Sequence, residues 1–281
     1  MALPDDFDLE AFIERVLEED LGKRGDITSI ATIDEGARFT AEMNARQAIV
    51  IAGIDIASAF FRKLDPDVEI ELLAEDGQSV TRHTTLVRLS GNARAMLAAE
   101  RSALNTLQHL SGIATLTRQY VDAIEGSGAA LLDTRKTLPG LRILEKFAAR
   151  MGGAHNHRMR LEDGVLIKDN HVAVSGGVSE AVQRAKSAGT ALQIQVEVDR
   201  LNQIEPALGA GADRLLLDNM DPAMLREAVR IVNRRVPLEA SGGVTLETIR
   251  FLAETGVDFI SVGRITQSAP AVDIGLDYSI N

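Results

Sequence analysis

The chain has 281 residues and a net charge of −11, contains no cysteine, and is 45% hydrophobic and 25% charged. This composition is typical of a globular protein and excludes disordered or collagen-like chains, disulfides, zinc–thiolate sites and a cysteine nucleophile. The acidic balance argues against binding to nucleic acid or anionic membranes, and no apolar run reaches the roughly 18 residues of a membrane span. The N-terminal sequence Met1-Ala-Leu-Pro-Asp-Asp lacks the features of a secretory signal, so we expect a cytoplasmic protein.

The first part of the chain predicts a small α+β domain. Apolar residues have helical spacing over residues 7–21 and 55–64, and strand-like runs cover 39–54, 68–74 and 85–89. A long Ala- and Leu-rich helical stretch follows over residues 94–124. We predict a break in it at Ser111-Gly112 and place the domain junction there.

Beyond Ser127, short apolar strands alternate with helical segments. The predicted strands are 130–133, 165–168, 194–197, 215–218, 237–241 and 259–263, and the later helices are 201–208, 222–232 and 245–254. Nearly continuous apolar strands alternating with helices are typical of a buried parallel sheet. The last four strand ends lie 21 to 23 residues apart, which predicts a parallel βα barrel of about six strands, open or incomplete. An open doubly wound sheet is the alternative, although its glycine fingerprints are missing.

Every predicted strand ends in a charged or glycine-rich element. In parallel barrels, ligands bind at these carboxyl ends. The elements are Asp133-Thr134-Arg135-Lys136, Lys168-Asp169-Asn170, Glu197, Asp218, Ser241-Gly242-Gly243 and Gly263-Arg264. A purely structural barrel needs few such residues, so the pattern favours a working site.

The charges and glycines at these ends indicate the kind of ligand. The window from Arg135 to His171 holds eight Lys and Arg residues against four acids, which favours a ligand with several negative charges. Glycines before a helix, as in Ser241-Gly242-Gly243 and again at Gly263, suit a phosphate group. Glu197 and Asp218 could hold a hydroxyl-bearing ring or Mg²⁺. Together they suggest a sugar phosphate meeting a small polycarboxylate.

Other interpretations of single motifs stay open on these grounds. The glycine segments could be tight turns, and Glu197 and Asp218 could cap the following helices. His155-Asn-His157 could bind a transition metal, and Lys168 could form a Schiff base. His83 and His109 have no companions in the sequence and are predicted to be structural.

A set of motifs nevertheless resembles one family, the quinolinate phosphoribosyltransferases, in residue order from Glu19 to Pro270. The motifs are Glu19-Asp-Leu-Gly-Lys-Arg-Gly-Asp-Ile-Thr28, Glu100-Arg-Ser-Ala-Leu-Asn105, Asp133-Thr-Arg-Lys-Thr-Leu-Pro-Gly140, Asn156-His-Arg158, Leu166-Ile-Lys-Asp-Asn-His171, Val196-Glu197, Leu217-Asp-Asn219 and Glu239-Ala-Ser-Gly-Gly243. The combination of the third and fifth motifs is highly specific.

The resemblance implies a fold and a reaction. Residues 1–112 would form an α/β-sandwich domain, joined by the tail 271–281, and residues 113–270 the barrel domain. The family transfers a phosphoribosyl group from phosphoribosyl pyrophosphate to quinolinate, with Mg²⁺, and releases nicotinate mononucleotide, pyrophosphate and carbon dioxide for NAD biosynthesis. It also implies at least a homodimer, in which the sandwich domain of one subunit closes the barrel of the other.

The resemblance also implies site residues. The quinolinate positions are Thr134, Arg135, His157, Arg158, Lys168 and, from the partner subunit, Arg101. The phosphoribosyl pyrophosphate positions are Lys136, Glu197, Asp218, Ser241, Gly242, Gly243 and Gly263, with Glu197 and Asp218 also serving the metal. Catalytic roles fall to Lys136, Lys168, Glu197 and Asp218.

One residue departs from the family pattern, and two alternative functions remain. The family usually has a small residue where Arg264 stands. A paralogous branch associated with molybdenum uptake shares part of the motif set, although Ile167-Lys-Asp-Asn-His171 and Arg101 argue against it. A sensor that binds a phosphoribosyl ligand without turnover is the other alternative, disfavoured by the intact Lys168, Glu197 and Asp218.

Overall fold

Two separately packed units make up the chain in the computed structural model, which describes residues 7–279. The first unit contains the chain up to Thr117, residues 143–153 and the chain from Ser268 onward, and the second contains residues 118–142 and 154–267. The acidic segment 1–6, used above in predicting the location, lies outside the described residues. Within the described part, no helix combines the length and the apolar character needed to cross a bilayer.

An antiparallel sheet with the strand order β12-β1-β5-β3 organises the first unit. Its strands are β1 (Arg38–Ala45), β3 (Glu69–Leu72), β5 (Thr85–Asn92) and β12 (Ile274–Ser279), and a separate pair is formed by β2 (Ile49–Val50) and β4 (Ser79–Val80). The prediction of one strand over 39–54 is wrong. Strand β1 ends at Ala45, and Ile49 and Val50 pair instead with Val80 and Ser79 of β4.

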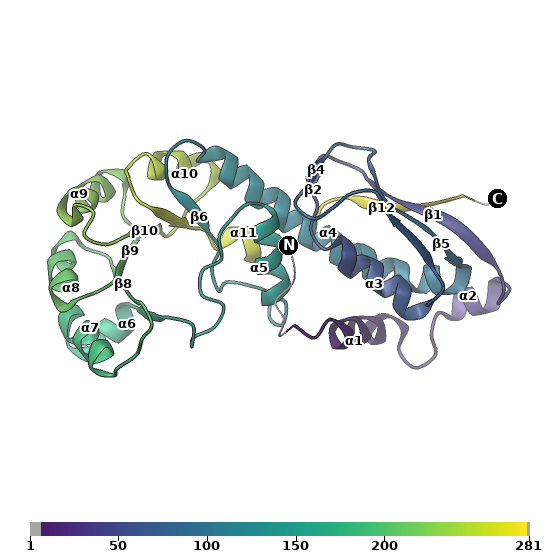
Figure 1. Ribbon diagram of the computed structural model, residues 1–281, viewed down its shortest axis with the longest axis horizontal. Coiled ribbons are helices and arrows are strands. Elements are labelled where there is room, and N and C mark those ends of the chain that lie inside the picture. Colours follow the sequence, from purple (N-terminus) through teal and green to yellow (C-terminus); the bar gives the residue numbers. More distant parts are fainter. Residues whose placement is uncertain (1–6, 280–281) are drawn as a thin grey trace. The chain divides into compact units, whose positions relative to one another are not determined.

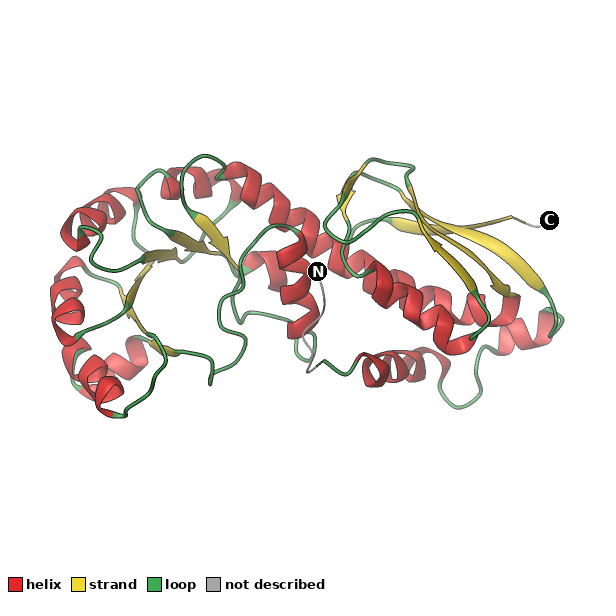
Figure 2. Cartoon of the chain, in the orientation of Figure 1, coloured by secondary structure: helices red, strands yellow, loops and turns green. Residues whose placement is uncertain are grey.

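Helices cover one face of this sheet, as Figure 2 shows. They are α1 (Leu9–Leu21), α2 (Ile27–Thr32), α3 (Ile54–Leu64) and the first part of α4 (Ala93–Ala123), and α5 (Arg142–Met151) also lies mainly in this unit. The predicted helices over 7–21 and 55–64 are confirmed. The side chains of Phe60 and Phe61 on α3 are fully buried, so the core lies between α3 and its neighbours.

The long helix α4 runs without the predicted break at Ser111-Gly112. Both residues serve packing within the first unit. A Cβ on Gly112 would collide with the carbonyl oxygen of Pro270, and the Ser111 hydroxyl accepts a hydrogen bond of 3.1 Å from the N–H of Ala52. Gly112 therefore permits a close approach of the backbone and does not end the helix.

The second unit is built on six parallel strands in the order β6-β11-β10-β9-β8-β7. They are β6 (Ala130–Leu132), β7 (Val165–Ile167), β8 (Ile194–Val198), β9 (Arg214–Asp218), β10 (Leu238–Ser241) and β11 (Phe259–Ser261). The prediction of an open βα barrel is confirmed, since within residues 7–279 the end strands β6 and β7 do not pair with each other.

Helices lie outside this curved sheet, as Figure 1 shows for α7 to α10. The set is α6 (Asp169–Ser175), α7 (Val178–Ser187), α8 (Ile204–Ala210) preceded by a 3₁₀ turn over Leu201–Gln203, α9 (Pro222–Val232), α10 (Leu246–Ala253) and α11 (Arg264–Gln267). Helix α9 coincides with its prediction because its ends are encoded locally. Asp221 accepts a hydrogen bond from the N–H of Met224 at the start, and Asn233 ends the helix in the left-handed conformation.

We expect the substitution Gly112→Ala to destabilise the first unit, because the new methyl group would meet main-chain atoms that cannot rotate away. Overpacking of this kind costs about 1–3 kcal/mol in the free energy of unfolding. Urea unfolding followed by circular dichroism measures it. The control is Gly209→Ala in α8, where a Cβ would meet no atom within 4 Å. That exchange should stabilise the protein by about 0.5–1 kcal/mol, and equal effects of the two variants would contradict the packing role of Gly112.

Candidate active site

The site candidates stand on the inner face of the barrel strands. Side chains alternate along a strand, so Glu197 shares a face with Gln195 on β8, and Ser241 shares a face with Glu239 on β10. The amide of Gln195 donates a 2.8 Å hydrogen bond to the carboxylate of Glu239, across the intervening strand β9. This contact identifies the inner face and places Glu197 and Ser241 on the same face, toward the carboxyl ends of their strands.

Glu197 and Asp218 form an acidic pair at the ends of neighbouring strands. Partial burial, and next the charge of Asp218, raise the pKa of Glu197 above its ordinary value. Burial likewise raises the pKa of Asp218. Neither residue caps a following helix, since Arg200 and Asp221 occupy the N-cap positions. Two carboxylates whose charges act on each other in a half-buried place favour a cation or a developing positive charge between them.

Two lysines complete this cluster. Lys136 and Lys168 both lower the pKa of Asp218 against the effect of its burial, and Lys168 also lowers that of Glu197. The main chain at Lys136 is fixed on both sides: its N–H bonds the hydroxyl of Thr134 at 3.0 Å, and its carbonyl accepts from the hydroxyl of Thr266 at 2.6 Å. The structure therefore brings together the four residues predicted to be catalytic.

A buried carboxylate attaches the His-Arg loop to the barrel edge. Asp133, fully buried after β6, accepts hydrogen bonds from the side chain of Asn156 and from the main-chain N–H of His157, the latter at 2.8 Å. One parallel bridge joins Leu132 to His155. The segment before Arg158 thus adds a short strand-like piece to the open edge of β6.

This attachment places Arg158 beside Arg135. Burial, and next the nearby charge of Arg135, lower the pKa of the Arg158 guanidinium. Arg158 is held by a 2.8 Å hydrogen bond from its Nη1 to the carbonyl of Gly164, and the buried Nε of Arg135 has no hydrogen-bond partner among the described residues. Two guanidinium groups in mutual repulsion, one with an unused donor, are suited to bind an anion between them.

The glycine segments have the conformations that a phosphate seat requires. Gly242 and Gly243 have φ of +101° and +59°, and a Cβ on Gly242 would collide with Asn219 after β9. A Cβ on Gly263 would stand 2.7 Å from Cδ of Lys136. The first segment therefore needs glycine, whereas a larger residue at 263 would displace the Lys136 side chain. The first segment leads into helix α10, whose N-terminal N–H groups can bind an anion.

The remaining candidates lie elsewhere or have other partners. Arg101 is exposed on α4 in the first unit. Arg264 is exposed, and its charge acts on Tyr120 and on Glu247 of α10. His109, predicted to be structural, has a buried partner: its Nε2 lies 2.9 Å from the fully buried carboxylate of Glu145, a contact across helices that sequence spacing does not reveal. His83 lies in a turn with φ of +71°.

Sequence reasoning missed a buried polar layer below the site, formed by Gln195, Arg214 and Glu239. Arg214 lies 2.8 Å from the carboxylate of Glu239, and its guanidinium stands 4.0 Å from the ring centre of Phe259. The sequence does contain a signal for this layer. Gln195 and Glu239 are polar residues within apolar strands, and each stands two positions before a site candidate, Glu197 in β8 and Ser241 in β10.

Within residues 7–279, no three His, Asp or Glu side chains gather closely enough to hold a metal ion by themselves. The interpretation of His155 and His157 as part of a transition-metal site therefore gains no further ligand. Glu197 and Asp218 offer two carboxylates, which fits Mg²⁺, an ion that keeps several waters and commonly binds one or two carboxylates together with substrate phosphates.

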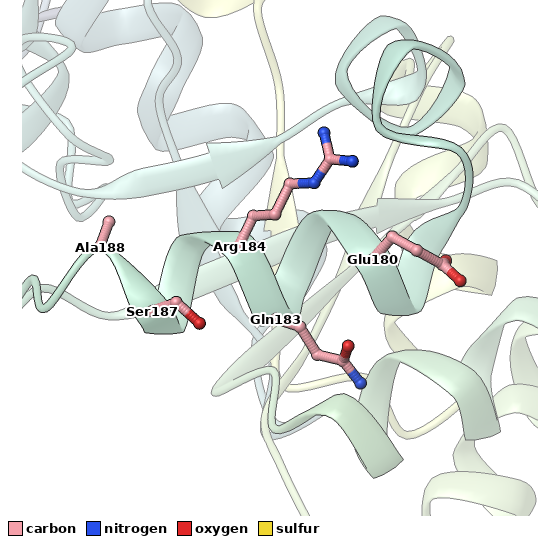
Figure 3. A pocket seen from close by; sticks show the side chains of 5 residues that line it. All are labelled: Glu180, Gln183, Arg184, Ser187 and Ala188. Atoms are coloured by element: carbon pink, nitrogen blue, oxygen red, sulfur yellow. The ribbon is translucent and has the colours of Figure 1, made fainter.

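A shallow depression on the outside of the barrel lies apart from these residues. Figure 3 shows its lining, which comes from α7 and the residue after it: Glu180, Gln183, Arg184, Ser187 and Ala188. The long side chains of Glu180, Gln183 and Arg184 point in different directions and do not converge on a common point. None of the site candidates lines it.

Comparison with known families gives matches over both parts of the chain. Residues 26–111 match the model "Quinolinate phosphoribosyl transferase, N-terminal domain", and residues 113–277 match "Quinolinate phosphoribosyl transferase, C-terminal domain". A nicotinate-nucleotide pyrophosphorylase [carboxylating] of Mycobacterium leprae is 43% identical, over 94% of this chain and 95% of the relative. A probable nicotinate-nucleotide pyrophosphorylase [carboxylating] of Bacillus subtilis is 39% identical, over 97% and 94%.

Solved structures are similar over nearly the full length. The nicotinate-nucleotide pyrophosphorylase from Francisella tularensis superposes with a TM-score of 0.94 at 39% identity and covers 99% of this chain and 98% of its own. The enzyme of the same name from Ehrlichia chaffeensis gives a TM-score of 0.94 at 40% identity, with coverage of 98% and 100%.

We expect the substitution Asp218→Asn to lower the pKa of Glu197, because it removes the negative charge that raises this pKa. Lys168→Met should act in the opposite direction, since the lysine charge favours the ionised carboxylate. Carboxyl ¹³C NMR titration of glutamate-labelled protein measures both effects, with Glu197→Gln to assign the signal. An unchanged Glu197 titration in Asp218→Asn would show that the two carboxylates do not interact.

Proposed function

The chain belongs to the quinolinate phosphoribosyltransferase family, and from this we propose how its own residues carry the reaction. The enzyme is a carboxylating pyrophosphorylase: it joins quinolinate to the ribose of phosphoribosyl pyrophosphate and makes nicotinate mononucleotide for NAD biosynthesis. The names of its relatives support this main interpretation of the sequence over the alternatives raised there.

One observation carries the assignment of roles. The pair Glu197 and Asp218 interacts with Lys136 and Lys168 at the strand ends, and the arginine pair Arg135 and Arg158 stands together after β6 and its added bridge. The acidic pair suits a sugar that becomes positively charged, and the arginine pair suits a compound with two carboxylates. These are the two halves of the reaction.

Quinolinate is bound by the cationic residues. Arg135 and Arg158 hold its two carboxylates by paired hydrogen bonds, with Thr134, His157 and Lys168 around them. The pyridine nitrogen is a weak nucleophile next to a carboxylate, so fixing both carboxylates keeps this nitrogen in line with the ribose. Such orientation can lower the barrier by several kcal/mol.

The acidic pair acts on the ribose of phosphoribosyl pyrophosphate. Bond breaking at its anomeric carbon leaves positive charge on the ring, which Glu197 and Asp218 stabilise, and negative charge on the departing pyrophosphate, which Lys136 stabilises. The 5′-phosphate is held by the main-chain N–H groups of Ser241-Gly242-Gly243 and by Gly263. Any Cβ at Gly263 would displace the side chain of Lys136, so the proposed phosphate site lies directly beside this lysine.

Mg²⁺ is the proposed cofactor, with Glu197 and Asp218 as its protein ligands, directly or through water. When bound, the ion neutralises negative charge on the pyrophosphate oxygens. Loss of carbon dioxide then follows from the positive pyridine nitrogen, which stabilises the electron pair left on the adjacent ring carbon until that carbon takes up a proton from water. We therefore assign no residue the role of an essential proton carrier.

A homodimer is proposed as the working form, with Arg101 donated to the partner's quinolinate site. Helix α6, which directly follows Lys168, has no buried residue in the single chain, and its Val174 is 88% exposed. An apolar side chain so exposed beside a site is suited to an interface. The cytoplasmic location and any larger assembly stay predictions of the sequence.

The activity itself is tested by release of carbon dioxide from quinolinate in the presence of phosphoribosyl pyrophosphate and Mg²⁺. We expect turnover with the wild type and its loss on chelation of the metal. In Arg135→Met the KM for quinolinate should rise about 10- to 100-fold, because a charged pair of hydrogen bonds is lost, while the KM for phosphoribosyl pyrophosphate changes little. Tight binding of either substrate without any product would contradict the proposed function.

Sharing of Arg101 between subunits is tested by mixing two inactive variants. Arg101→Ala and Lys136→Met each damage every site of their own homodimer. A mixed dimer contains one intact site, so random mixing should restore about a quarter of the wild-type rate. The rate of the mixture is compared with the mean of the two separate variants. A mixture that does not exceed this mean, although mass spectrometry shows mixed dimers, contradicts the donation of Arg101.

A further inference from the structure

Glu239 lies in the barrel interior among polar groups and has no exposure to solvent. One of its oxygens, Oε2, is 2.8 Å from Nε2 of Gln195, 2.8 Å from Nη2 of Arg214 and 3.6 Å from Nε2 of His157. Burial of a carboxylate is costly unless nearby groups offset it. A buried carboxylate at this position of β10 therefore costs stability, and we ask what function it serves.

The ring of His157 is oriented by the contacts of its two nitrogens, Nδ1 and Nε2. Its Nδ1 accepts a hydrogen bond of 2.7 Å from the main-chain N–H of Arg158, so Nδ1 carries no proton. The ring proton of the neutral imidazole then lies on Nε2, the nitrogen that faces Glu239. The main chain of His157 is held separately by Asp133. Two buried carboxylates thus hold one residue, Asp133 through its backbone and Glu239 through its ring.

We propose that Glu239 is a positioning residue for the quinolinate site, fixing the tautomer and orientation of His157 from below. This rests on the proposed function, which puts His157 and Arg158 around quinolinate. The fixed ring in turn accepts the N–H of Arg158, so the orientation of the ring is transmitted to the arginine that binds the substrate.

The charge balance of the layer supports this role. Burial would raise the pKa of Glu239, but His157, Arg214 and Ser261 together lower it below its ordinary value, so the carboxylate is ionised. Arg214 alone could serve as the counter-charge. A carboxylate present only to balance Arg214 would not need to face Nε2 of His157, and this difference separates the two roles.

The experiment compares Glu239→Gln, Arg214→Met and the double variant Glu239→Gln/Arg214→Met. Each single variant leaves one buried charge without its partner and should lose stability, whereas the double variant removes both charges and should recover much of it. We expect the double variant to keep a KM for quinolinate raised about tenfold, with the KM for phosphoribosyl pyrophosphate within about twofold of wild type. Recovery of the quinolinate KM along with the stability would overturn the proposal.

A second measurement does not depend on activity. In ¹⁵N NMR of histidine-labelled protein, assigned with His157→Gln, wild-type His157 should show an unprotonated Nδ1 and a protonated Nε2. The double variant should show a mixture of tautomers or a free ring. An unchanged His157 spectrum in the double variant overturns the role of Glu239. Absence of carbon dioxide release by the wild type would instead reject the proposed function, and the spectrum would still decide the Glu239–His157 connection.

Discussion

The cationic side of the site depends on one buried carboxylate, that of Asp133. It accepts hydrogen bonds from Asn156 and His157 and so ties a segment to β6 that is more than twenty residues away along the chain. Without this attachment the open edge of the barrel would have no neighbour there, and Arg158 would not stand beside Arg135. A fully buried carboxylate thus decides where two predicted binding groups meet.

The acidic side follows from the regular geometry of the sheet. Strands β8 and β9 are adjacent and parallel, with Glu197 paired in register to Leu216 and Asp218 paired to Ser241 of β10. Residues at the ends of neighbouring parallel strands are close without any special contact. The acidic pair is therefore a product of the fold, whereas the arginine pair needs a specific tether.

This difference explains what could be predicted from the sequence. Helix α9 and the six strands were readable because Asp221, Asn233 and the apolar runs encode them locally. The continuity of α4 was not, since Gly112 looks like a helix breaker until the carbonyl of Pro270 is seen beside it. The same holds for Glu239, which the motif includes but whose partners come from Gln195, Arg214 and His157, far apart in sequence.

The chain passes back and forth between the two units, so no single cut separates them. Residues 143–153 and the chain from Ser268 onward pack with the first unit, although both are joined to segments of the second. A gene cut near residue 112 would thus produce a barrel fragment that carries α5 and β12 without the surfaces on which they pack. Strand β12 pairs with β1 from Thr40 to Ala45. The barrel fragment would therefore carry an unpaired strand prone to aggregation, and the other fragment would have an unpaired sheet edge. The barrel unit and the first unit would therefore have to be inherited and recombined together, as one gene segment.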